Sequence, residues 1–182
     1  MNITTFPEIN TERLILRKIE ESDSDVILFL RSDKIVNKFI DRPENRKTKN
    51  IFDAINHIKK LNTETVNNKS FSWGITLKNE PKIIGTICLW NFSKDYKTAE
   101  VGYDLNPLFQ RKGIMNEALK SVVNFGFTTL RLEKIEAFTH VQNENSQKLL
   151  VRNRFYLAKD KKDKDNFSNI LFEIKKPVVK NL

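Results

Sequence analysis

The chain has 182 residues and a mass of 21.4 kDa; 39% of the residues are hydrophobic and 30% are charged. A chain of this size and composition can bury a sizeable core, so we expect one domain spanning residues 1–182. Its apolar runs, such as 83–90, are strand-sized and far shorter than the roughly 20 residues of a membrane-spanning helix, which argues against a membrane protein.

The formal net charge of +9 and the pI of about 9.6 favour an anionic partner. Lysine is spread along the whole chain, however, with no basic block, no RNA-binding aromatic motif and no metal-ligand spacing. We therefore expect no direct nucleic-acid site and no metal. The first residues lack a signal-peptide core, and the single Cys88 lies in an apolar run. This pattern predicts a cytoplasmic protein with a buried, unreactive thiol.

The N-terminal third of the chain reads as one strand followed by helices. The alternation of 11–17 predicts a strand, and Ser22 or Asp23 can cap a helix over 24–31. A second short helical piece is expected over 33–40, ending before Pro43. Apolar residues at helical spacing then predict a helix over 50–65.

From residue 70 the hydrophobic period changes from helical to alternating. Strands are expected over 70–78, 82–90 and 98–105, then a helix over 113–129, a strand over 134–141, a helix over 143–153, and two closing strands at 155–158 and 167–175 separated by a polar loop at 159–166. This order predicts an α/β fold with a mixed, mostly antiparallel central sheet flanked by helices.

The stretch from Gln110 to Gly113 combines two basic residues, one glycine and the start of a helix. A helix start presents unpaired backbone N–H groups and the positive end of a dipole, and glycine lets a bulky anion approach the backbone. The stretch lacks the spacing of a Walker loop and of the dinucleotide-binding glycine motif. Read alone, it is either a basic turn or a phosphate site.

Several motifs in order resemble the GCN5-related N-acetyltransferase (GNAT) superfamily, and within it the ribosomal-protein alanine/serine N-acetyltransferase (RimJ/RimL-like) group. The glycine motif of that family stands here as QRKGIM, at 110–115. The resemblance covers about residues 9 to 175, with further motifs TERLILR at 11–17, IIGTICL at 83–89, AEVGYDLNP at 99–107 and NENSQKLLVRNRF at 143–155. It implies a GNAT fold over the whole chain.

The resemblance implies acetyl-CoA as co-substrate, with its pyrophosphate on the backbone N–H groups of 111–116. Its pantetheine arm would run along the strand 98–105 like an added strand. The contacts implied in this way are Tyr103, Leu105, Gln110, Arg111, Lys112, Gly113, Ile114, Met115, Asn116, Asn143 and Ser146. For Asn143 and Ser146 the sequence leaves helix capping as an alternative role.

The implied reaction needs a base, because an amine acceptor is mostly protonated at neutral pH. Glu100 lies within the strand beside the expected co-substrate and is the preferred base, with Asp104 as second choice. A glutamate that is merely solvated or salt-bridged is the alternative. Ser146 is the preferred donor of a proton to the leaving thiolate, with Tyr103 or Tyr156 as alternatives.

Two positions depart from the family pattern. Met115 stands where glycine or alanine is usual, and Arg154 stands where glycine precedes a phenylalanine. Elsewhere, His57 is expected on a helix surface, and Trp73 and Trp90 in the core, although Trp90 ends a strand and could line an acceptor pocket. The helices of 24–66, with Phe39, would shape that pocket.

The sequence thus predicts an N-acetyltransferase that acetylates a primary amine by direct attack on a thioester. The resemblance favours the N-terminal α-amine of a ribosomal or other protein as acceptor. A small-molecule amine such as a polyamine or aminoglycoside remains an alternative acceptor. A non-catalytic acyl-CoA-binding or RNA-binding module is the alternative from another class. The sequence leaves open whether the chain forms a homo-oligomer.

Overall fold

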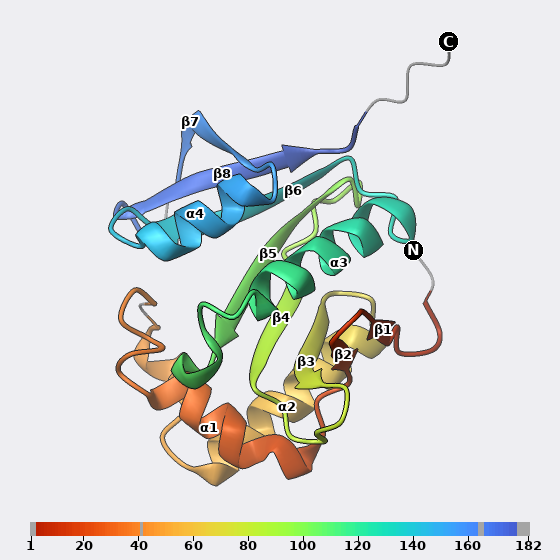
Figure 1. Cartoon of the computed structure of the whole chain (residues 1–182), viewed down its shortest axis with the longest axis vertical. Helices are drawn as coiled ribbons and strands as arrows, with labels where there is room; N and C mark the ends of the chain where they lie inside the picture. The colour runs from red at the N-terminus through yellow and green to blue at the C-terminus, as the bar shows by residue number, and fades with distance from the viewer. Residues whose placement is uncertain (1–2, 41, 164–165, 178–182) are drawn as a thin grey trace.

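The computed structural model describes residues 3–40, 42–163 and 166–177. An eight-stranded sheet with the order β1-β2-β3-β4-β5-β6-β8-β7 lies at its centre (Figure 1). The strands are β1 Ile9–Asn10, β2 Leu14–Arg17, β3 Phe71–Leu77, β4 Gly85–Trp90, β5 Thr98–Leu105, β6 Lys134–His140, β7 Tyr156–Lys162 and β8 Asn169–Lys175. The α-helices are α1 Ser24–Ser32, α2 Ile51–Val66, α3 Ile114–Thr128 and α4 Glu144–Arg152. Neighbouring strands are antiparallel except β5 and β6, which confirms the predicted sheet.

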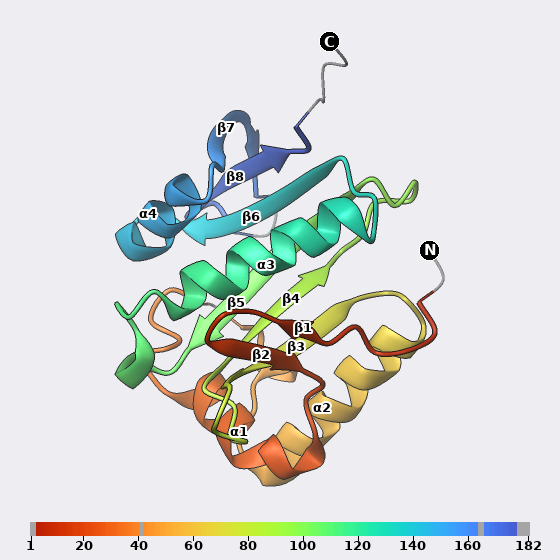
Figure 2. The same ribbon diagram turned by 45° about the vertical axis from the view of Figure 1, so that its right-hand side comes forward.

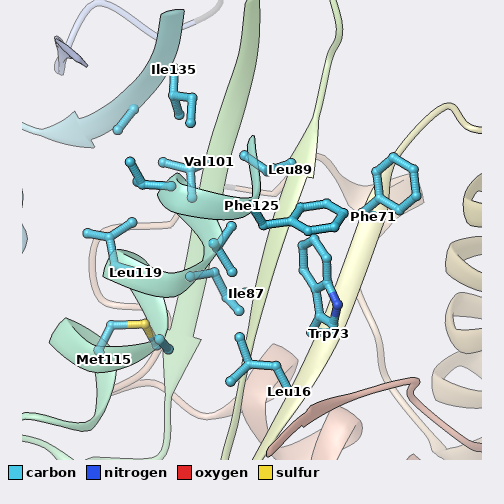
Figure 3. Packing of buried hydrophobic residues seen from close by; sticks show 14 of the residues in the cluster. Leu16, Phe71, Trp73, Ile87, Leu89, Val101, Met115, Leu119, Phe125 and Ile135 are labelled. Carbon is cyan, nitrogen blue, oxygen red and sulfur yellow. The ribbon is translucent and has the colours of Figure 1, made fainter. Parts of the chain in front are cut away.

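Helices α3 and α4 cover one face of the sheet, and α1 and α2 cover the other (Figure 2). Alternate residues of β3 turn toward α3, where the Trp73 ring lies 5.4 Å from the Phe125 ring (Figure 3). On the opposite face Ile83 packs with Ile27 and Ile58 from the helix pair. The sheet therefore separates the hydrophobic cluster under α3 and α4 from the one under α1 and α2. Side chains that alternate along one strand reach different surroundings on the two faces.

The sequences of α2 and α3 explain how α2 begins and how α3 packs against the sheet. Asn50 caps α2 by accepting a hydrogen bond of 2.9 Å from the Asp53 N–H. Helix α3 buries one continuous stripe at spacings of three and four residues. Truncating a fully buried member of it, such as Leu119, to alanine costs about 2–5 kcal/mol of stability in comparable cores.

Strands β5 and β6 pair in parallel only over their first residues, Thr98–Glu100 with Lys134–Glu136. Beyond that point β5 continues to Leu105 and β6 to His140, but the two strands no longer pair with each other and they diverge (Figure 1). The Asn106 N–H donates to the Ile84 carbonyl on the β4 side, at 2.9 Å. Because backbone groups alternate in direction along a strand, those of residues 101, 103 and 105 face the opening. The sheet thus contains an internal, unpaired strand edge.

Three elements differ from the sequence predictions. Residues 33–40 form turns rather than a helix, because the Asp33 carboxylate accepts from the N–H groups of Ile35 and Val36 and the Asn37 amide bonds the Leu30 carbonyl. The short β1 was not expected. Strand β7 extends to Lys162, into the predicted loop at 159–166, since lysines are compatible with an edge strand; positions 164–165 of that loop lie outside the described residues.

Candidate active site

The start of α3 presents backbone N–H groups without acceptors in the helix. Its first internal bond runs from the Glu117 N–H to the Gly113 carbonyl, at 3.1 Å, which leaves the N–H groups of 114–116 without a helix carbonyl. Gly113 has a φ of 77° and no side chain that could cap them. Arg111 also has a positive φ, of 61°. This left-handed turn and bare helix end form an anion-binding geometry.

A carboxylate and a guanidinium from distant segments hold this turn in place. Arg13 donates to the Lys112 carbonyl at 3.1 Å and to the Glu117 carboxylate at 2.7 Å. Thr11 adds a bond of 2.6 Å to Glu117. Burial raises the pKa of Glu117, but the bonds from Thr11 and Arg13 outweigh it, so the pKa is lowered. A Cβ on Gly113 would lie 3.3 Å from the Arg13 Nη2 atom, so the turn has little spare room.

The predicted contacts at 110–116 divide into exposed side chains and buried ones. Residues 110–113 are exposed, while Ile114 and Met115 are buried. The Met115 side chain lies beside Leu119 in the core (Figure 3), so it leaves the space above the turn free. Both residues can therefore offer only backbone N–H groups. Asn116 accepts a bond of 3.0 Å from the Asn153 amide, which ties α3 to α4.

The diverging strands bring Tyr103 and Leu105 to the same opening. The Gln110 side-chain amide donates to the Leu105 carbonyl at 3.1 Å, so this glutamine folds back onto β5. The Tyr103 hydroxyl lies 2.9 Å from the Ser146 Oγ on α4, across the opening. Burial raises the pKa of Tyr103 to about 12, which keeps its hydroxyl protonated at neutral pH.

Asn143 and Ser146 occupy the first turn of α4. The Asn143 carboxamide accepts a bond of 3.2 Å from the Ser146 N–H, so Asn143 caps the helix. Ser146 is half-buried with its hydroxyl toward Tyr103. The capping alternative holds for Asn143, and the Ser146 side chain lies at the opening.

Glu100 lies on the other face of β5, toward α1 and α2. It is half-buried and accepts a bond of 2.6 Å from the Asn91 amide. Gly102 is on the same face, where a Cβ would lie 3.3 Å from the Cys88 Sγ and 3.8 Å from the Trp90 Nε1. The glycine therefore lets Cys88 and Trp90 of β4 pack close to β5, next to Glu100, which pairs with Trp90 on β4 and with Glu136 on β6.

Cys88 and Trp90, the neighbours of Gly102 on β4, differ in how they meet the sequence predictions. Burial raises the pKa of the Cys88 thiol to about 12, which makes it unreactive, as predicted. Trp73 is fully buried, as predicted, and donates to the Pro7 carbonyl. The prediction that Trp90 lies in the core is wrong: it ends β4 and is 42% exposed.

Asp104, the second candidate base, is held by Thr86. Its carboxylate accepts from the Thr86 hydroxyl at 2.8 Å and from the Thr86 N–H at 3.1 Å. Burial raises the pKa of Asp104. Both bonds end on the same oxygen, Oδ1, and they fix the Asp104 carboxylate against β4.

Two further expectations about single residues are wrong. Tyr156 lies on β7, separated from β6 by β8, and its hydroxyl donates to Glu173 at 2.8 Å, away from the opening. His57 is half-buried rather than on the helix surface: burial, together with nearby Arg31 and Arg42, lowers its pKa to about 3. Sequence spacing did not reveal the arginines that it faces.

The chain after α1 reaches the far side of the opening. The Phe39 ring stacks on the His140 ring, with centroids 5.3 Å apart, at the end of β6. The contact places Phe39 next to β6; that it shapes an acceptor pocket stays a prediction. A separate open hollow of about 260 Å³ lies between Phe29, Ile84 and Phe109, and none of the predicted site residues lines it.

Within the described part of the chain, no group of three metal-ligating side chains is found. No helix there is long and apolar enough to cross a membrane.

Comparison with known proteins decides the family. The model of the acetyltransferase (GNAT) domain matches residues 13–156. The chain belongs to the GNAT acetyltransferases. It is 32% identical to the uncharacterized N-acetyltransferase YoaA of Bacillus subtilis over 150 residues, which cover 82% of this chain and 83% of YoaA. The predicted enzyme class is thereby confirmed.

Solved structures of GNAT enzymes share the fold. The ribosomal-protein-S5-alanine acetyltransferase of Vibrio fischeri superposes with a TM-score of 0.77 at 25% identity, covering 93% of this chain and 96% of that one. RimL, a ribosomal L7/L12 α-N-protein acetyltransferase solved with coenzyme A, superposes with a TM-score of 0.78 at 18% identity, covering 93% and 98%. These matches support the RimJ/RimL-like grouping predicted from the motifs.

Proposed function

We propose that this GNAT enzyme transfers the acetyl group of acetyl-CoA to the N-terminal α-amine of a protein. The observation that supports it best is the parting of β5 and β6 directly beside the bare N-terminus of α3. The unpaired edge between β5 and β6 suits an extended polar arm, and the start of α3 suits a pyrophosphate. A CoA thioester contains both groups, the pantetheine arm and the pyrophosphate. The ribosomal-protein acetyltransferases among the structural neighbours favour a protein N-terminus as acceptor.

The turn 110–113 and the N–H groups of 114–116 would bind the pyrophosphate. The backbone groups of Tyr103 and the N–H of Leu105, whose carbonyl already accepts from Gln110, would bond the pantetheine arm as a neighbouring strand does. The fit rests on free donors and an unpaired edge that the fold already provides. Arg111 and Lys112 would add charge at the exposed rim.

Glu100 would remove the proton of the attacking amine, directly or through water. An α-amine has a pKa near 8 and is largely protonated at neutral pH, so this transfer is required before attack. The new bond joins the amine nitrogen to the thioester carbonyl carbon, and the carbon–sulfur bond breaks. Backbone N–H groups of β5 would stabilise the negative charge on the carbonyl oxygen.

Ser146 would donate a proton to the departing thiolate and take one from the Tyr103 hydroxyl, which would regain its proton from water after product release. Burial raises the pKa of Tyr103 to about 12, so its hydroxyl is protonated at the start of each turnover. Asn143 would act indirectly, by fixing the first turn of α4.

Thiol release from acetyl-CoA tests the proposal against its alternatives. The purified chain is mixed with acetyl-CoA and, in parallel, with peptides with free N-termini, the same peptides with blocked N-termini, polyamines and aminoglycosides. We expect release only with free N-terminal peptides. Turnover confined to a polyamine or aminoglycoside would replace the acceptor. Binding of RNA, steeply salt-dependent and without binding of acetyl-CoA, would replace the enzyme.

A further inference from the structure

Two half-buried arginines lie on the α1 and α2 side of the sheet with only neutral partners. Arg31 donates to the Thr48 hydroxyl and the Arg46 carbonyl, both at 2.7 Å, and Arg42 donates to the Asn37 carboxamide. Among the described residues, neither forms an ion pair with a carboxylate. A guanidinium removed from water without a counter-charge is unfavourable, so its retention points to a ligand.

The surrounding charges do not neutralise this pair. Asp104 on β5 attracts both arginines, but a single carboxylate offsets at most one of their two positive charges. From α2 the pair faces His57, which is neutral, and Lys60. Burial and the positive charges of Arg42 and Arg46 together lower the pKa of Arg31 to about 10, against the opposing effect of Asp104. The cluster keeps an excess of positive charge on the face of the sheet that carries Glu100.

This cluster shares a face of β5 with the candidate base. Asp104 lies four residues from Glu100 on the same face, or roughly 13 Å at about 3.3 Å per residue. Phe39, three positions before Arg42, stacks on His140 at the end of β6, so this loop borders the opening. An acceptor amine near Glu100 would place its other end near the arginines.

We infer that the acceptor carries a carboxylate or phosphate group that binds Arg31 and Arg42 while its amine approaches Glu100. The inference rests on the proposed acetyl transfer and specifies its substrate. The roughly 13 Å between Glu100 and Asp104, whose charge acts on both arginines, matches three to four residues of extended peptide. The acceptor is therefore a protein N-terminus with an acidic side chain at about the third position.

Matched acceptors and variants test this on the intact chain. Peptides that differ only by Glu or Gln at position three are compared, together with an aminoalkyl phosphate. Wild type should acetylate the Glu peptide with at least tenfold higher kcat/KM, and Arg42→Gln should remove the preference by raising KM for the Glu peptide alone. Arg42→Lys should retain part of it. Lys120→Gln, which removes one exposed charge from α3, is the control and should retain all of it.

Phosphate binding gives a readout that needs no turnover. With saturating coenzyme A filling the pyrophosphate turn, inorganic phosphate should bind wild type and Lys120→Gln by calorimetry, and bind Arg42→Gln at least tenfold more weakly. Because Arg42 donates a hydrogen bond only to Asn37 among the described residues and forms no ion pair there, the variant should keep a Tm close to that of wild type.

The outcomes separate the two proposals. Equal acetylation of both peptides, unaffected by Arg42→Gln, overturns the anionic acceptor and leaves acetyl transfer standing. Arg42-dependent acetylation of the aminoalkyl phosphate alone supports the anion site and overturns the protein N-terminus. Phosphate binding that Arg42→Gln leaves unchanged overturns the anion site whatever the peptides do.

Discussion

The Tyr103 hydroxyl on β5 lies 2.9 Å from the Ser146 Oγ on α4, at the place where β5 and β6 part. If this pair passes a proton to the leaving thiolate, Ser146→Ala should lower kcat about 10²-fold or more, as loss of an acid catalyst does. Tyr103→Phe should lower it less, because the Ser146 hydroxyl remains.

The acetyl-CoA KM should stay within about threefold of wild type in both variants, as measured by steady-state thiol release. The Ser146→Ala/Tyr103→Phe double variant should be no slower than Ser146→Ala, since the two groups act in series. Losses in kcat that multiply in the double variant would contradict proton transfer from Tyr103 through Ser146.

Glu100→Gln should lower kcat about 10²-fold or more while leaving acetyl-CoA affinity nearly unchanged, because the side chain faces away from the pyrophosphate turn. Asp104→Asn is the matched comparison, and it should have the smaller effect on kcat. Turnover of Glu100→Gln equal to wild type at every pH would remove Glu100 as the base.

His57 gives a prediction for stability against pH. Its pKa is lowered from 6.5 to about 3, so the unfolded state binds a proton below pH 6.5 that the folded state does not. The contribution is fully present above pH 6.5 and is lost as the pH falls toward 3. Urea denaturation should show wild type losing stability between pH 6.5 and 5, and His57→Gln losing less. His140→Gln is the control, and equal slopes in wild type and His57→Gln would contradict the assignment.

Arg154 occupies the left-handed region, with a φ of 66°, where the family pattern has glycine. The turn keeps its geometry through bonds from Arg154 and Phe155 to the last carbonyls of α4. Arg154→Gly should therefore raise the free energy of unfolding by up to about 1 kcal/mol, and Arg154→Ala should not. Chemical denaturation measures both, and a glycine variant less stable than the alanine variant would refute the strain.

Much of the fold follows from local sequence signals. The alternation at 98–105 and the 3.6-residue stripe after Gly113 predicted β5 and α3 closely, because periodicity reports directly which face is buried. The turns at 33–40 were missed because Asp33 and Asn37 bond the backbone through their side chains, a competition that periodicity does not reveal.

The site is only partly predictable for a different reason. Gly113 and Ser146 belong to local motifs, whereas Arg13 reaches the turn from a hundred residues away, and Arg31 meets Arg42 only after the chain folds. No spacing rule joins such pairs. The half-buried position of His57 likewise depends on a neighbouring helix and loop.

Every step of the proposed reaction depends on acetyl-CoA binding along the internal edge of β5 and at the start of α3. Amide hydrogen exchange followed by NMR measures this binding residue by residue. Saturating acetyl-CoA should slow exchange at Tyr103 and Leu105 together with Ile114 to Asn116. Gly113→Ala should bind at least tenfold more weakly, because its φ of 77° disfavours a side chain and Arg13 lies 3.3 Å away. Lys112→Gln should lose only about two- to threefold, the effect of one exposed charge. Unchanged exchange at both segments with acetyl-CoA bound, or no binding at millimolar acetyl-CoA, would contradict the account.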